Sequence, residues 1–154
     1  MKINFSKYNG AGNDFILIDD RKNFIVDNKS LISYLCDRHF GVGADGLIIL
    51  KESNNCDFEI LHYTSDGNLG SLCGNGSRCA VLFAYNKNII GRKTVFKAFD
   101  GIHSAEILDD ELIKMEMNVN SDIVSNSYGT WLDTGSPHLV LSLIHISEPT
   151  RPSQ

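Results

Sequence analysis

Apolar residues recur with two different periods along most of the chain, which predicts short strands mixed with two helices. In residues 29–39 they fall on one face of a helix, which Ser30 could cap. In residues 76–86 they cover more than one stripe, so we expect that helix to be buried centrally. Strands are predicted over 2–8, 15–19, 47–50, 58–63, 94–99, 102–108, 112–119, 131–133 and 138–143.

This order predicts an α+β fold in which a mixed or antiparallel sheet is wrapped around one central helix. Asp66-Gly67-Asn68 has the composition of a hairpin turn after the strand at 58–63. Residues 118–130 are polar and rich in Asn and Ser, which is typical of a linker or crossing segment. The tail from residue 147 shows no periodicity.

Composition narrows the class of protein. The chain has 154 residues, of which 42% are hydrophobic and 21% charged, as in globular domains. The net charge is −5 and the longest basic run is Arg92-Lys93, which argues against nucleic acid as a partner. The N-terminus lacks the apolar core of a signal peptide, and no apolar stretch approaches the roughly 18 residues that cross a membrane. We therefore expect a cytoplasmic protein without a membrane partner.

The four cysteines are expected as thiols in that compartment. Their spacing contains no Cys-x-x-Cys pair, so no structural zinc site is predicted. Each cysteine is then either buried or reactive. Cys79, inside the second predicted helix, fits a core position.

Two glycine-containing motifs suggest functions that their context does not support. Residues 41–46 satisfy Gly-x-Gly-x-x-Gly, but a helix precedes them and a strand follows, the reverse of a dinucleotide site, so a tight turn is the better interpretation. Residues 133–136 read Asp-Thr-Gly-Ser, as in aspartic proteases. One copy would require a homodimer, in which two carboxylates share a proton.

Residues 72–79, Leu-Cys-Gly-Asn-Gly-Ser-Arg-Cys, carry the most specific chemistry. Cys73 is expected to end a strand, and a helix begins almost at once after it. The first N–H groups of a helix have no partner within the helix, so they can bind a carboxylate. The same position favours the thiolate of Cys73 over the thiol. The alternative is a buried cysteine before a glycine-bracketed helix start.

This segment resembles the first catalytic-cysteine motif of diaminopimelate epimerases. Four more blocks of the chain resemble that family in the same order, over residues 1 to about 141. They are Lys7-Tyr8-Asn9-Gly10-Ala11-Gly12-Asn13-Asp14-Phe15, Asp37-Arg38-His39-Phe40-Gly41-Val42-Gly43-Ala44-Asp45-Gly46, Ser65-Asp66-Gly67-Asn68 and Gly135-Ser136-Pro137-His138.

The resemblance implies two pseudo-symmetric domains with the active site between them. A cysteine from each domain faces the substrate α-carbon; one thiolate removes the α-proton and the other thiol returns a proton to the opposite face. The reaction interconverts LL- and meso-diaminopimelate, for lysine and cell-wall synthesis, with no cofactor, neither pyridoxal phosphate nor a metal. The full-length enzyme is expected to be a homodimer in the cytoplasm.

The same resemblance implies roles for individual residues. Cys73 corresponds to one acid/base thiol, and His138 to the partner that accepts or relays its proton. Without the family, His138 could equally be an exposed histidine after a proline turn. Substrate binding falls to Asn13 and to the backbone of Gly74 and Asn75.

Two positions depart from the family pattern. Thr64 and Ser136 stand where many members have a substrate-binding Asn. Both residues are small and polar, so we expect substrate contact to persist with less reach. The change affects fine specificity more than the type of reaction.

The end of the chain departs further. We expect an N-terminal epimerase domain over 1–119, a crossover and the first strands of a truncated second domain over 120–141, and a tail over 142–154 that is unrelated to the family and could be an artefact of truncation or cloning. The second cysteine of the family is not found. The chain alone is therefore expected to be inactive.

Three other hypotheses stay open at this point. The first is a related isomerase of the same superfamily, such as a proline or hydroxyproline racemase or a phenazine-pathway isomerase. Cys73 argues against the phenazine enzymes, which have a carboxylate there, and the Asn-Asp-Phe block argues against the racemases. The second is a non-catalytic half-domain that binds a carboxylate, and the third is the homodimeric aspartic protease.

Overall fold

The chain divides into two units, Met1–Asn118 and Val119–Gln154. The computed structural model describes residues 3–23, 28–109, 112–119 and 122–141. The tail predicted over 142–154, and the end of the strand predicted over 138–143, lie outside the described residues.

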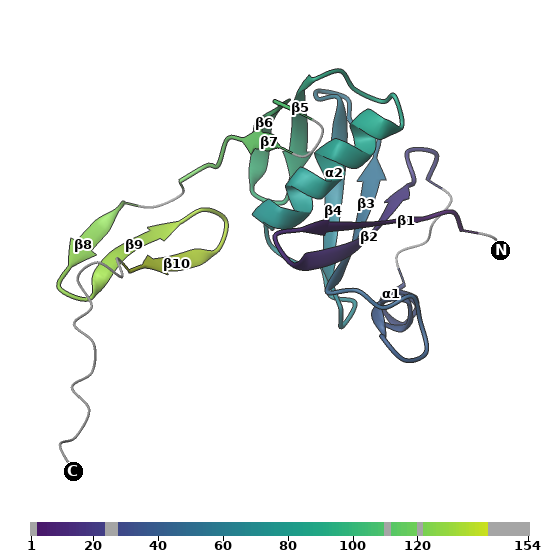
Figure 1. Cartoon of the computed structure of the whole chain (residues 1–154), viewed down its shortest axis with the longest axis horizontal. Helices are drawn as coiled ribbons and strands as arrows, with labels where there is room; N and C mark the ends of the chain where they lie inside the picture. Colours follow the sequence, from purple (N-terminus) through teal and green to yellow (C-terminus); the bar gives the residue numbers. More distant parts are fainter. Residues whose placement is uncertain (1–2, 24–27, 110–111, 120–121, 142–154) are drawn as a thin grey trace, which may run out of the picture. The chain divides into compact units, whose positions relative to one another are not determined.

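Seven strands of the first unit form one mixed sheet in the order in which they occur along the chain (Figure 1). Pairing is parallel between β2 and β3 and between β4 and β5, and antiparallel between the other neighbours. The strands are β1 (Ser6–Gly10), β2 (Asn13–Asp19), β3 (Gly46–Lys51), β4 (Phe58–Thr64), β5 (Lys93–Ala98), β6 (Gly101–Ile107) and β7 (Ile113–Met115). The helices are α1 (Lys29–Cys36) and α2 (Gly74–Asn86).

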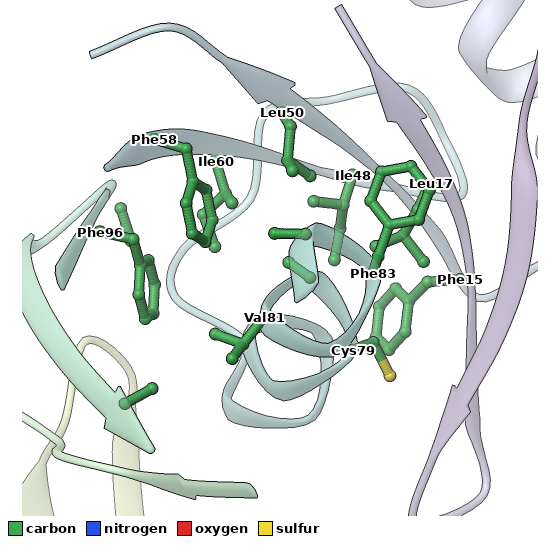
Figure 2. Packing of buried hydrophobic residues seen from close by; sticks show 14 of the residues in the cluster. Phe15, Leu17, Ile48, Leu50, Phe58, Ile60, Cys79, Val81, Phe83 and Phe96 are labelled. Carbon is green, nitrogen blue, oxygen red and sulfur yellow. The ribbon is translucent and has the colours of Figure 1, made fainter. Parts of the chain in front are cut away.

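The sheet curls around α2, because that helix contacts both edge strands, β1 and β7, as well as strands between them. Figure 2 shows side chains of α2, among them Val81 and Phe83, facing side chains of the surrounding strands. Phe58 on β4 stacks on Phe96 on β5, with ring centroids 5.4 Å apart. The α+β fold with a sheet wrapped around a central helix is therefore confirmed.

Strands β2 and β3 are buried on both faces, which explains their continuous apolar sequences. Phe15 and Leu17 of β2 join the core around α2, whereas Ile16 and Ile18 join a second cluster that includes Ile32 of α1. Such a strand shows no alternation of apolar and polar residues, because neither face meets water.

Helix α1 begins at Lys29, as predicted, but its N-cap and its last residue differ from the prediction. Its N-cap is Asn28, not Ser30: Asn28 is extended and its side chain accepts a hydrogen bond from the N–H of Leu31. The helix ends at Cys36 because Asp37 is extended and its carboxylate accepts hydrogen bonds from the N–H groups of His39 and Phe40. These local hydrogen bonds compete with continuation of the helix.

Other element boundaries differ by a few residues. Strand β1 runs from Ser6 to Gly10 where 2–8 was predicted, and β7 runs from Ile113 to Met115 where 112–119 was predicted. The hairpin turn after β4 is confirmed: the N–H of Gly67 donates to the carbonyl of Thr64 at 2.8 Å. Gly67 has a φ of 81°, which glycine adopts without strain.

The second unit contains a three-stranded antiparallel sheet with β9 in the centre. Its strands are β8 (Val124–Asn126), β9 (Gly129–Asp133) and β10 (Pro137–Val140). Strand β8 lies in the segment predicted as a linker, so that prediction was wrong there. The strand is exposed and reads Val-Ser-Asn, which is too short to carry an alternating apolar pattern. Between residues 122 and 141 no side chain is buried.

Candidate functional site

Cys73 is the N-cap of α2, and does not end a strand as the sequence predicted. Its backbone is extended, and its sulfur accepts a hydrogen bond from the N–H of Gly76 at a distance of 3.4 Å. The first bond of the helix runs from the N–H of Ser77 to the carbonyl of Cys73, at 2.8 Å. The N–H groups of Gly74 and Asn75 precede that bond and so have no acceptor within the helix. They can bind an anion beside the sulfur.

The two glycines of this first turn differ in what surrounds them. A Cβ at Gly76 would lie 2.8 Å from Cδ1 of Ile48, so glycine is required for the helix start to pack on the sheet. A Cβ at Gly74 would meet nothing closer than 3.7 Å, where an Arg78 nitrogen lies. Gly74 is therefore not needed for packing, and its missing side chain leaves the helix end open.

The hairpin between β1 and β2 brings Asn13 to this helix end. Its turn has Ala11 and Gly12 at positive φ, 54° and 86°, as a two-residue hairpin requires. Gly10 allows the close approach, since a Cβ there would lie 3.0 Å from the carbonyl oxygen of Asn75. The amide oxygen of Asn13 lies 3.9 Å from the sulfur of Cys73 and accepts its S–H hydrogen bond.

A charged cluster lies behind Asn13. Its amide nitrogen donates to a carboxylate oxygen of Asp45 at 2.8 Å. Arg38 donates to Asp14 and to Asp45, each at 2.7 Å. The hydrogen bonds from Arg38, helped by the neighbouring Lys7, hold the pKa of Asp14 well below its ordinary value. The pKa of Asp45 is also lowered, first by the hydrogen bond from Asn13, so both carboxylates are ionised at neutral pH.

The sulfur of Cys73 thus has a donor on one side and an acceptor on the other. The N–H of Gly76 stabilises a thiolate, and the oxygen of Asn13 stabilises the protonated thiol. A group that gives and takes a proton needs both states within reach. Cys79, further along the same helix, is buried and unsuited to this chemistry, because burial raises its pKa to about 11.

The structure brings together four of the seven residues proposed for the site: Asn13, Cys73, Gly74 and Asn75. The side chain of Asn75 accepts a hydrogen bond from Arg78. Thr64 is the exposed last residue of β4, and its hydroxyl donates to Asp66 in the turn that follows.

The other two, Ser136 and His138, belong to the second unit. His138 lies on β10 opposite Leu132 of β9, and its side chain is exposed. The carbonyl of Ser136 accepts a hydrogen bond from the N–H of Thr134 in the turn between those strands.

The sequence interpretation missed the roles of Asp14, Arg38 and Asp45, which it treated only as parts of family blocks. One signal could have found them. Asn13-Asp14 directly precedes the strand predicted over 15–19, and Asp45 lies two residues before the strand predicted over 47–50, so parallel pairing of the two strands would bring these side chains to one edge.

Among the described residues, no group of three or more His, Cys, Asp or Glu side chains could hold a metal ion. Neither described helix is long and apolar enough to span a membrane.

Comparison with known proteins shows the family of this chain. The family model of diaminopimelate epimerase matches residues 5–121. The diaminopimelate epimerase of Flavobacterium psychrophilum is 50% identical over 136 residues, which cover 87% of this chain and 53% of the relative. The diaminopimelate epimerase of Chlorobaculum tepidum is 39% identical over 138 residues, which cover 85% of this chain and 54% of that relative. The chain spans about half the length of the curated relatives it matches.

Solved structures support the fold. A phenazine biosynthesis protein of the PhzF family from Bacillus anthracis superposes with a TM-score of 0.60 at 17% identity, covering 77% of this chain and 42% of that one. A probable proline racemase from Agrobacterium radiobacter K84 superposes with a TM-score of 0.57 at 12% identity, covering 85% of this chain and 48% of that one. At such identities the likeness concerns the fold alone. The family match and the half-identical relative show that the chain belongs to the diaminopimelate epimerase family.

Proposed function

We propose that this chain supplies the Cys73 half of an epimerase that interconverts LL- and meso-diaminopimelate by proton transfer at the α-carbon. Cys73 is one of two acid/base thiols, and the second comes from the other half of the complete enzyme. The observation that carries the proposal is the N-cap position of Cys73, which puts the sulfur beside N–H groups that can hold a carboxylate.

Negative charge develops on the substrate during the proposed reaction. Removal of the α-proton of an amino acid spreads negative charge onto the α-carboxylate. The backbone N–H groups of Gly74 and Asn75, at the positive end of the helix dipole, would stabilise that charge in place. A sulfur at the same helix end is then close to the carbon that loses the proton.

The remaining roles follow the family. Asn13 offers its amide oxygen to the substrate or to the thiol, and His138 accepts or relays the proton of Cys73. Thr64 and Ser136 contact the substrate in place of the Asn that is usual in the family. The chemistry needs no cofactor and no metal, because cysteine can act as both acid and base near neutral pH.

We further propose that the complete enzyme is a cytoplasmic homodimer with a small-molecule substrate, and that this chain alone is inactive. Two alternatives are a related racemase or isomerase that also needs no pyridoxal phosphate, and a half-domain that binds a carboxylate without turnover. Comparison of diaminopimelate with proline and hydroxyproline as substrates distinguishes the related racemase or isomerase from the proposed epimerase. Calorimetric binding of diaminopimelate without exchange would favour the second.

The test uses a chimera that joins residues 1–140 of this chain to the part of the Flavobacterium psychrophilum relative that the match does not cover. We expect the chimera to convert LL- into meso-diaminopimelate, measured by chiral chromatography. The 154-residue chain alone should produce neither conversion nor α-proton exchange in heavy water. A folded chimera without activity on diaminopimelate would contradict the proposed substrate, and exchange by the chain alone would contradict its inactivity.

A further inference from the structure

We propose that Asp45 is a positioning residue for Cys73: its carboxylate holds the NH2 end of the Asn13 amide and thereby turns the carbonyl end toward the thiol. This inference rests on the proposed function in one respect only, the acid/base role of Cys73. The orientation of Asn13 itself follows from contacts among the described residues.

The contacts leave one orientation for the amide. The Asn13 nitrogen donates to Oδ2 of Asp45 at 2.8 Å, and the backbone N–H of Asp14 donates to the same oxygen at 3.1 Å. An ionised carboxylate only accepts hydrogen bonds, so a flipped Asn13 would place one acceptor against another. The Asn13 oxygen must therefore face away from Asp45, and it lies 3.9 Å from the sulfur of Cys73.

Asp45 can impose this orientation because it is itself held firmly. The parallel register of β2 and β3 pairs Phe15 with Gly46, which places Asp45 beside the residues that open β2. The N–H of Asp45 donates to Oδ1 of Asp14 at 3.0 Å, so the two aspartates exchange hydrogen bonds. Arg38 bridges their carboxylates, with a contact of 2.7 Å to each.

The orientation has a consequence for the sulfur. With its oxygen toward Cys73, Asn13 accepts the S–H hydrogen bond and favours the thiol. The N–H of Gly76 has the opposite effect, because it donates to the sulfur and favours the thiolate. If Asp45 is lost, the Asn13 amide is free to rotate and present its NH2 group. The thiolate then gains a second donor, and the thiol should react faster with an alkylating agent.

The experiment measures alkylation of Cys73 by iodoacetamide in the 154-residue chain at pH 7.5, resolved by peptide mass spectrometry. We expect Asp45→Asn to accelerate alkylation about three- to tenfold, a factor that corresponds to the net free energy of one hydrogen bond. Asp45→Glu, which keeps an acceptor-only carboxylate, should stay within about twofold of the native chain. Asp19→Asn is the matched control, since it removes an aspartate paired with Arg21 at the other end of β2.

A double-mutant cycle separates orientation from charge, because removal of any nearby carboxylate also favours a thiolate. In an Asn13→Ala background, Asp45→Asn should change the alkylation rate by less than about twofold. An equal acceleration in both backgrounds would show that Asp45 acts through its charge and would overturn the proposal. So would a folded Asp45→Asn chain that reacts at the native rate.

A measurement on the native chain covers the case in which Asp45→Asn does not fold, as judged by circular dichroism. A nuclear Overhauser effect is expected between the Asn13 side-chain NH2 and the amide proton of Asp14, because both groups donate to Oδ2 of Asp45. Strong effects to the β-protons of Cys73 would overturn the proposal. None of these readouts needs turnover, so an inactive chimera would refute the proposed function and leave the role of Asp45 to be judged separately.

Discussion

Cys73 caps the first turn of α2, whereas Cys79 lies in the interior of the same helix. The first sulfur is half-buried and contacts the N–H of Gly76 and the side chain of Asn13. The second is packed in the core, where burial raises its pKa to about 11. Two cysteines of one helix thus have different surroundings: the sulfur at the N-cap lies within reach of hydrogen-bond partners, whereas the sulfur in the helix interior is packed in the core.

The interior of α2 should account for much more of the stability than its exposed surroundings. Phe83→Ala removes a buried ring that faces β1, where it contacts Tyr8 edge-on. We expect it to lower the free energy of unfolding by about 3–5 kcal/mol, measured by urea denaturation. Phe99→Ala, a control in which the side chain is 70% exposed, should change it by less than about 0.5 kcal/mol. Equal effects of the two substitutions would contradict the packing around α2.

The two thiols should differ strongly in reactivity. At pH 8 a thiol whose pKa is about 11 is only about 0.1% thiolate, so Cys79 should be protected both by protonation and by burial. We expect Cys73 in the native chain to be alkylated at least ~100-fold faster than Cys79, as judged by peptide mass spectrometry. In 6 M guanidinium the difference should disappear. A Cys79 that reacts as fast as Cys73 in the folded chain would remove the contrast.

The two glycines in the first turn of α2, Gly74 and Gly76, should differ in how substitution by alanine affects stability. Gly76→Ala forces a Cβ to 2.8 Å from Ile48 and should cost about 1–3 kcal/mol of stability. Gly74→Ala has room and should be neutral or slightly stabilising, by up to about 1 kcal/mol, because alanine favours the helix. Urea denaturation of both variants measures the difference. A Gly74→Ala chain less stable than the Gly76→Ala chain would show that the packing at this helix start is misassigned.

Burial of Cys79 also predicts a pH dependence of stability. Because the folded chain holds this thiol proton more tightly than the unfolded chain, stability should fall as the pH rises from about 9 to 11, by about 1–2 kcal/mol. Cys36 should contribute in the same direction, since burial raises its pKa to about 11 as well. Cys79→Ala should flatten the profile between these pH values, and so should Cys36→Ala.

The fold was largely predictable from sequence, because its core strands and helices have strong patterns. The central burial of α2 followed from its broad apolar surface, which the contacts of both sheet edges with that helix explain. Strand β8 was not predictable, since its three residues are exposed and only Val124 is apolar. The N-cap and the last residue of α1 were also not predicted, because side-chain hydrogen bonds of Asn28 and Asp37 set them, and periodicity carries no information on such bonds.

The candidate site was predictable only in part. Cys73 and the open helix end follow from local sequence, since glycines and a helix start lie within a few residues of the sulfur. The contact of Asn13 with Cys73 depends on a hairpin that meets a helix 60 positions later in the chain. Asp45 reaches Asn13 only through the parallel register of two strands. Such long-range contacts depend on the fold, which local pattern does not encode.

The most direct test of the central claim asks which sulfur exchanges the α-proton. The chimera carrying residues 1–140, with Cys73→Ser or Cys79→Ser, is incubated with LL-diaminopimelate in heavy water, and loss of the α-proton signal is followed by NMR. The account predicts that Cys73→Ser lowers the exchange rate by about 10²–10⁴-fold, while Cys79→Ser stays within a few-fold of the parent. Undiminished exchange by a folded Cys73→Ser chimera would contradict it.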